Sequence, residues 1–131
     1  MSNEMPSINF QWGASEKLDG NDRFRQLDLT EDGMAITVVW ETWLKSGAEA
    51  EGLRLTRQVW SDMRAFEGYV SHELLVDQDT PGHIIVLGRW RSRDDADQVR
   101  ERYKDSETIR RLTPLLARPR DRWITVVDRQ P

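Results

Sequence analysis

The sequence predicts an α+β protein of the ferredoxin-like class, a βαββαβ chain whose four-stranded antiparallel sheet carries helices on one face. Two observations predict this class. Four runs rich in β-branched and aromatic residues alternate with two amphipathic runs, in the order strand, helix, strand, strand, helix, strand. The two runs that this topology places at the centre of the sheet, 34–43 and 83–92, are also the most apolar on both faces. Pattern and topology therefore agree.

The composition is that of one globular domain. A chain of 131 residues with 37% hydrophobic and 32% charged residues can bury a core of its own. No apolar run approaches the roughly 20 residues of a membrane helix, so we expect no membrane association. The chain has no cysteine, which excludes disulfides and thiolate sites and suits a reducing cytoplasm. Residues 1–6 lack the features of a secretory signal, so we expect a cytoplasmic protein.

The charge distribution does not favour nucleic-acid binding. The formal net charge is −4, although residues 89–131 hold eleven Arg and one Lys against eight Asp and Glu. These basic residues alternate with acidic ones along a predicted helix and form no stripe of a single sign. We therefore expect no nucleic-acid partner.

The first 33 residues are predicted to be a partly ordered N-terminal extension, followed by the domain proper at 34–131. The extension is polar and shows no sustained period, but it holds more aromatic residues than a disordered tail does. We expect the segment around Phe10 and Trp12 to pack on the domain or on a neighbouring subunit. Asp32-Gly33 is a turn signal that separates the two parts.

The first half of the domain is predicted to form a strand, a helix and an edge strand. Residues 34–43 form the first strand, and the Ser-x-x-Glu spacing of Ser46 and Glu49 predicts a capping box that begins a helix. An amphipathic stripe continues to Phe66, and Gly68 is predicted to end the helix. Residues 69–77 are more polar than the first strand, as an edge strand should be.

The second half repeats this pattern. Residues 78–82 make a turn and lead into the strand at 83–92, in which four aliphatic residues follow one another. Ser92 and Asp95 repeat the spacing of a hydroxyl three residues before a carboxylate, which predicts a second helix start. Ser106 suggests that this helical region is divided in two. Residues 123–128 form the last strand.

One face of this sheet has no helices to cover it. Helices on the other face leave an apolar surface that a monomer would expose to water. A two-fold dimer that packs sheet against sheet would bury this surface, so we expect a homodimer. The residues expected on it are Thr37, Val39, Ile85, Leu87 and either Ile124 or Val126.

The best candidate for a ligand site is a pocket between sheet and helices. The chain has six tryptophans but only two histidines, and it contains no metal-ligand spacing, phosphate-binding glycine loop or nucleophile elbow. Gly88 leaves room on the strand for a ligand or for a closely packed helix. A pocket for a flat aromatic molecule would be lined by Trp40, Trp60, His72, Val86, Trp90 and Tyr103. The alternative is that these aromatic residues form part of the core and that His72 is a hydrogen-bonded strand residue.

Residues 34–128 resemble the antibiotic biosynthesis monooxygenase (ABM) domain family, the dimeric α+β barrels. The segment 66–71 around Gly68, the strand-ending Trp90 with Arg91-Ser92, and the segments 45–49 and 115–116 carry the resemblance. It implies a homodimer and, in some members, oxygenation of phenolic polycyclic substrates without metal, flavin or haem. The resemblance also implies roles for a tryptophan at Trp90 and an arginine at Arg110.

The sequence departs from the family at two positions on which the oxygenating members depend. The family's asparagine on the same strand falls on Val86, and its tyrosine falls near Ala96. The haem-degrading branch has an asparagine, a tryptophan and a histidine where this chain has Trp40, Val99 and Ile109, so haem is not expected.

Three functions follow as hypotheses. The first is a cofactor-independent monooxygenase acting on an aromatic or polyketide-like molecule, with Trp40 and Trp90 as pocket walls. In it Arg110 stabilises a substrate phenolate and His72 serves as base. The second is a non-catalytic dimeric ligand-binding or accessory protein. The third is a cyclase on the same fold.

Overall fold

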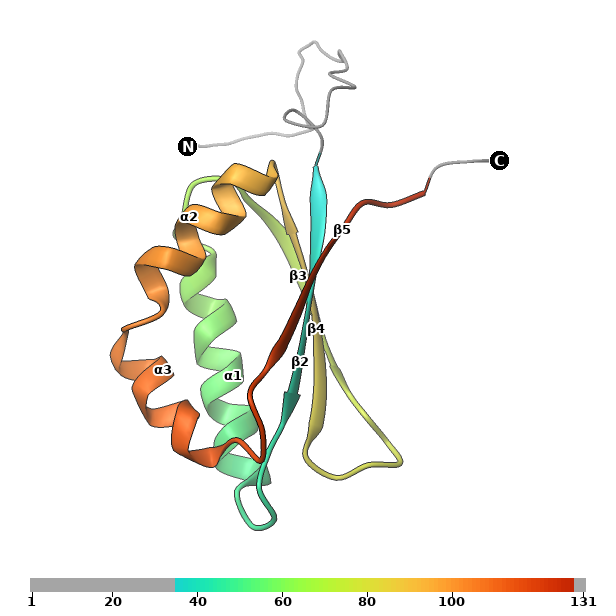
Figure 1. Ribbon diagram of the computed structural model, residues 1–131, viewed down its shortest axis with the longest axis vertical. Coiled ribbons are helices and arrows are strands. Elements are labelled where there is room, and N and C mark those ends of the chain that lie inside the picture. The colour runs from blue at the N-terminus through green and yellow to red at the C-terminus, as the bar shows by residue number, and fades with distance from the viewer. Residues whose placement is uncertain (1–34, 129–131) are drawn as a thin grey trace, which may run out of the picture. The chain divides into compact units, whose positions relative to one another are not determined.

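The computed structural model describes residues 35–128, in which helices cover one face of a single sheet (Figure 1). The chain divides into two units, residues 1–34 and 35–131, and the expectations for residues 1–33 lie outside the described part. The elements run in the predicted order and are β2 (Ile36–Trp43), α1 (Glu49–Met63), β3 (Tyr69–Val76), β4 (His83–Trp90), α2 (Arg93–Tyr103), α3 (Glu107–Leu112), a 3₁₀ turn (Thr113–Leu115) and β5 (Asp121–Thr125).

The sheet has the ferredoxin-like topology that the sequence predicts. Its strand order is β3-β4-β2-β5, and all three neighbouring pairs are antiparallel. The two most apolar runs of the sequence, β2 and β4, are the central pair, with Val38 opposite Gly88 and Trp40 opposite Val86. The more polar β3 is an edge strand, also as predicted.

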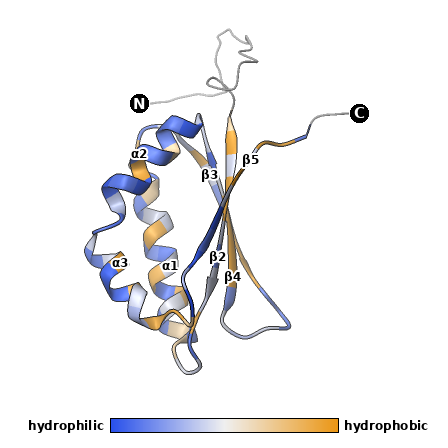
Figure 2. Cartoon of the chain, in the orientation of Figure 1, coloured by the Kyte–Doolittle hydropathy of each residue, from blue (hydrophilic) through white to orange (hydrophobic). Residues whose placement is uncertain are grey.

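The core lies between the sheet and the helices. Along β4 burial alternates strictly, so that Ile84, Val86 and Trp90 are buried while Ile85 and Leu87 on the other face are only partly covered. Helix α1 contributes the stripe Leu55, Val59, Trp60 and Met63 from the opposite layer. Figure 2 shows the same division, with hydrophobic residues along β2 and β4 and mainly hydrophilic residues on the outer surface of α2 and α3.

The two predicted capping boxes behave differently. The Ser92 hydroxyl accepts a hydrogen bond from the Asp95 amide at 3.1 Å and caps α2 as expected. The prediction for Ser46 is wrong, because α1 begins only at Glu49 and its N-cap residue, Ala48, offers no side-chain acceptor. The Glu49 carboxylate instead accepts from the Gly47 amide at 2.9 Å, in a turn where Gly47 has a φ of 89°.

The helix ends also differ in part from expectation. Ser106 divides the second helical region as predicted, and its hydroxyl accepts from the Ile109 amide at 3.2 Å to cap α3. Helix α1 ends at Met63, five residues before Gly68. Gly68 has a φ of 92° in the turn that leads into β3, where a Cβ atom would lie 2.5 Å from the side chain of Asp95.

Two details of the strands decide which residues share a face. An irregularity between Tyr69 and Ser71 changes the parity of β3, so Tyr69 pairs with Trp90 and lies on the helix side with His72. The last strand begins two residues earlier than predicted and pairs Ile124 with Val38, which places Ile124 on the helix side. Trp123, and not Ile124, lies on the open face, opposite Val39. No helix within residues 35–128 is long and apolar enough to cross a membrane.

Candidate functional site

A cavity of about 550 Å³ lies between the sheet and the helix layer. Its walls come from β2, α1, β4, α2 and α3 and from the segment that leads into β5. The volume is sufficient for a small polycyclic molecule. Apart from aromatic and basic side chains, the lining is mostly apolar and includes Val38, Val59, Met63, Ala96, Val99, Ile109 and Leu116.

Four of the predicted pocket residues do line this cavity, namely Trp40, Trp60, Trp90 and Tyr103. Trp90 is the last residue of β4 and is only 3% exposed. Its ring lies 6.5 Å from that of Trp60 on α1, and the edge of Tyr69 packs against it at 5.8 Å. These packed contacts fix the indole, so the wall of the cavity is preformed.

The phenol of Tyr103 is held by a carboxylate. Its hydroxyl donates a hydrogen bond to Oδ2 of Asp62 at 2.6 Å, across from α2 to α1. Burial raises the pKa of Tyr103 above its ordinary value, and the neighbouring Asp62 raises it further. Tyr103 is therefore protonated at neutral pH and acts in the wall as an apolar ring with an occupied hydroxyl.

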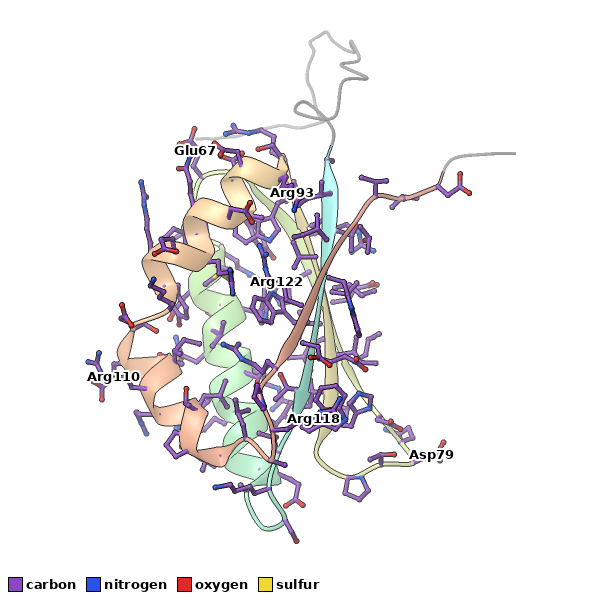
Figure 3. The ribbon with its side chains drawn as sticks, in the orientation of Figure 1. Glu67, Asp79, Arg93, Arg110, Arg118 and Arg122 are labelled. Carbon is purple, nitrogen blue, oxygen red and sulfur yellow. The ribbon has the colours of Figure 1, made fainter. Side chains whose placement is uncertain are left out.

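The end of the cavity near β5 is strongly basic. The guanidinium groups of Arg120 and Arg122 lie 4.7 and 5.7 Å from the ring centroid of Trp40. Figure 3 shows Arg122 in the space between the sheet and the helix layer. Three more basic residues line the cavity, Arg100, Lys104 and Arg118, whereas its lining includes no Asp, Glu or His.

Arg120 and Arg122 differ in how they are paired. Arg122 donates to Oδ1 of Asp97 at 2.8 Å, but its Nε is buried and has no hydrogen-bond partner among the described residues. Burial lowers the pKa of Arg120, and repulsion by Arg100 lowers it further. Sequence reasoning missed both residues. The available signal was the alternation of Arg118, Arg120 and Arg122 into the last strand, which places them on one side of an extended chain.

His72 does not line the cavity. It lies on β3, on the helix side of the sheet, and packs against Trp60 with the rings tilted and their centroids 5.4 Å apart. The Tyr69 hydroxyl and Nδ1 of His72 lie 2.6 Å apart and share a hydrogen bond. Burial lowers the pKa of His72, and nearby Arg64 adds to this effect. His72 supports the cavity wall through Trp60 and does not face the open side of the sheet.

Val86 and Gly88 belong to the core and not to the lining of the cavity. Val86 is 1% exposed. A Cβ atom at Gly88 would lie 2.3 Å from the ring of Trp60, so the space that this glycine leaves is filled by the tryptophan. Of the two readings that the sequence allowed for Gly88, close packing of a helix is the one found.

Arg110 lies on the solvent side of α3. Its Nη1 donates to the Asp105 carbonyl oxygen at 2.6 Å, and its Nη2 lies 3.7 Å from Glu107. In Figure 3 it projects away from the sheet. The structure therefore separates Arg110 from the cavity.

The open face of the sheet has an apolar centre with charged borders. One row across the four strands consists of Glu73, Leu87, Val39 and Trp123. Trp123 is 49% exposed and Leu75, in the next row, is 45% exposed. Arg89 lies 3.5 Å from Glu73 at one border.

His83 forms the opposite border of this face. Its Nδ1 lies 2.7 Å from Asp77 and its Nε2 lies 2.8 Å from Glu41. Its ring stacks on Trp43 at 5.1 Å, and the Arg118 guanidinium covers that indole at 3.5 Å. Asp77 raises the pKa of His83, and Glu41 adds to the effect against the opposing effect of burial. Within residues 35–128, no group of three or more His, Cys, Asp or Glu side chains could hold a metal ion.

Comparison with protein families matches residues 35–109, more than half of the chain, to the family described as antibiotic biosynthesis monooxygenase (ABM). Among solved structures, SnoaB, a cofactor-independent oxygenase from Streptomyces nogalater, superimposes with a TM-score of 0.66 at 16% identity, covering 74% of this chain and 96% of SnoaB. No curated protein matches.

Two further structures share the fold. Rv0793 from Mycobacterium tuberculosis has a TM-score of 0.61 at 21% identity and covers 73% of this chain and 97% of its own. A conserved protein from Methanosarcina mazei Go1 has a TM-score of 0.60 at 18% identity, with coverages of 73% and 95%. At these identities the similarity establishes the fold alone.

Proposed function

Because the chain belongs to the antibiotic biosynthesis monooxygenase (ABM) family, we propose that it is a cofactor-independent monooxygenase acting on an aromatic, polyketide-like molecule. One observation carries the proposal, namely the cavity of about 550 Å³ with three tryptophans and a tyrosine in its walls. Flat aromatic rings favour such walls because stacked and edge-to-face contacts add to the burial of apolar area. The described function of SnoaB, a structure with the same fold, supports the reaction class.

The reaction needs only the substrate and dioxygen. For an anthrone, the ring CH₂ group becomes a carbonyl, one oxygen atom of O₂ enters the product, and the other leaves as water with the two hydrogens of that carbon. All four electrons come from the substrate, whose deprotonated form delivers the first electron to oxygen. The protein binds the substrate, holds its orientation and favours its anion.

The basic end of the cavity favours that anion. The lining supplies five cationic side chains and no carboxylate or imidazole, so it contains no protein group that would act as general base at neutral pH. Guanidinium groups in a partly desolvated site stabilise a phenolate or enolate, which lowers the pKa of the bound substrate. In this scheme the proton passes to water, and neither His72 nor Arg110 has a role at the reacting atoms.

Oxygen uptake tests this proposal. Purified protein, without added metal or flavin, should consume O₂ with anthrone or a hydroxynaphthalene and form the quinone in equal amount. Trp90→Phe, which alters the wall, should lower the rate about tenfold, since misplacing the substrate affects the reaction steeply. Val70→Ala, on the exposed edge strand, is the matched control and should keep the rate. A complete lack of turnover across a panel of phenols would refute the proposal.

A second function is favoured by the same absence of a base from the cavity lining. A non-catalytic dimeric ligand-binding protein requires the aromatic walls and the basic end but no proton acceptor. Displacement of a fluorescent dye by phenols without oxygen uptake would support this second function.

We also infer that the chain forms a homodimer through the open face of the sheet. The apolar row Leu87, Val39 and Trp123 would be buried, and the charged borders at Arg89 and His83 would form the rim. Sedimentation equilibrium should give twice the chain mass, and Leu87→Asp should give the monomer.

A further inference from the structure

We propose that the ligand of the cavity is an aromatic carboxylic acid, whose carboxylate is bound by Arg120 with support from Arg100 and Arg122. The inference rests on the proposed function in taking this cavity as the ligand site. It goes further because it assigns the ligand an anionic substituent and names the residues that select it.

The first argument is the charge balance of the site. Five basic side chains and no acidic side chain line one cavity, although the whole chain has a net charge of −4. Three of the five are paired from outside the lining, since Arg122 donates to Asp97, Arg118 lies 3.4 Å from Asp121, and Lys104 lies 2.5 Å from Glu101. The guanidinium groups of Arg100 and Arg120 make no hydrogen bond or ion pair with other side chains among residues 35–128. The cavity therefore contains uncompensated positive charge, which an anion would neutralise.

The second argument is the environment of Arg120. The Arg120 side chain is half-buried, and its guanidinium lies 4.7 Å from the ring centroid of Trp40. Burial and repulsion by Arg100 lower its pKa, so both disfavour its charged form. A charged group in such a place is costly unless a counter-ion pairs with it. The buried Nε of Arg122, which lacks a partner, adds a second unsatisfied donor beside the same indole.

The third argument is the chemical type of the donors. A guanidinium offers two parallel N–H groups that match the two oxygens of a carboxylate. Trp40 lies under both guanidinium groups, so an aromatic ring bound along the apolar walls would present an acidic substituent to this end of the cavity. The walls bind the ring and the arginines select the acid.

Two matched probes test the inference. 6-Hydroxy-2-naphthoate and 6-hydroxy-2-naphthamide share ring and phenol but differ in charge. By isothermal titration calorimetry, the naphthoate should bind the wild-type protein at least about tenfold more tightly, and added salt should weaken its binding more than that of the amide. Equal affinities for the two probes, or no binding of either, would overturn the inference.

Variants locate the effect. Arg120→Gln and, separately, the exposed Arg100→Gln should each weaken naphthoate binding several-fold and leave the amide unchanged. Arg102→Gln removes the same charge from α2 outside the cavity lining and is the matched control. Circular dichroism melting would confirm that each variant folds. Equal weakening of both probes by Arg120→Gln would overturn the assignment.

Oxygen uptake with the same two hydroxylated probes separates this inference from the proposed function. A charge preference in binding without any oxygen uptake would refute the proposed function and support the inference. Uptake that is equal for naphthoate and amide would support the proposed function and overturn the inference.

Discussion

The two faces of the central strands β2 and β4 both have aliphatic residues at their centre but lie in different surroundings. On the helix face, Val38, Ile84 and Val86 are almost completely buried. On the open face, their neighbours Val39 and Ile85 are only partly covered. The open face has charged borders at both ends, whereas the helix face has a cavity with a basic end. The alternation of apolar residues alone does not distinguish a core from an interface.

The difference shows what each face provides. The helix face is closed by packing within the chain, so its residues carry the stability of the fold and hold the aromatic walls in place. The open face provides an apolar surface that residues 35–128 cover only in part. We expect the open face to contribute to the stability of the protein only when a second chain binds.

The largest expected effect separates neighbouring residues of β4. Val86→Asp places a carboxylate in the core without a partner and should destabilise the fold by at least about 4 kcal/mol, enough to unfold a marginal domain. Leu87→Asp changes the next residue, on the open face, and should leave a folded monomer. Circular dichroism and sedimentation of the two variants check this. Unfolding of both would mean that the faces contribute equally to the monomer.

The sequence predicted the order and pairing of the central strands because the runs that form β2 and β4 are apolar on both faces, and burial alternates strictly along β4. It did not predict the face of Tyr69, because a bulge adds one residue to β3 without a glycine or proline to mark it. It also did not distinguish Ser92, which caps a helix, from Ser46, which has the same spacing to a carboxylate but precedes a turn. The two serines differ in how far they lie from the helix start, since Ser92 directly precedes α2 whereas α1 begins three residues after Ser46.

The aromatic part of the site was predictable and its basic part was not. Trp40 and Trp90 occupy positions that strand parity places on the helix face, so the sequence leads directly to them. Arg120 lies outside regular structure and Arg122 in a short edge strand, so their alternation with Arg118 was the available signal but spans too few residues to assign a face. Arg110 and His72 came from residue type or resemblance, which do not define which way a side chain points.

Gly88→Ala should have the next largest effect, about 2 kcal/mol. The added methyl group would overlap the ring of Trp60, which lies 2.3 Å from the Cβ position, and overpacking of this kind destabilises a core by 1–3 kcal/mol as an order of magnitude. Since Trp60 also lines the cavity, the affinity for naphthoate should fall. Arg89→Ala, the next residue on the open face, is the control for urea unfolding. An unchanged urea midpoint for Gly88→Ala would show that the Trp60 ring can move aside without cost.

His83→Gln should have a smaller, pH-dependent effect of about 1 kcal/mol, since hydrogen bonds to charged groups contribute this order of free energy. Both ring nitrogens donate to carboxylates only when the imidazole is protonated. The pKa of His83 is raised in the folded protein, so its stabilisation is fully present below the ordinary histidine pKa of 6.5. It is lost as the pH rises through the raised value.

Urea unfolding of wild type and His83→Gln, in a Leu87→Asp background that removes association, checks this dependence. The difference in free energy of unfolding should be larger at pH 6 than at pH 9. The opposite trend would show that His83 is neutral when it contacts Asp77 and Glu41.

The smallest effect is expected for Arg89→Gln at the other border of the open face. Arg89 and Glu73 are both solvent-exposed and 3.5 Å apart, and such pairs contribute less than about 1 kcal/mol. In the Leu87→Asp background, Arg89→Gln should change the free energy of unfolding by less than about 0.5 kcal/mol. In the otherwise wild-type protein it should weaken dimerisation and reduce its dependence on salt, because a rim charge acts mainly on association. A large loss of monomer stability would instead assign the charged border of the open face to the fold itself.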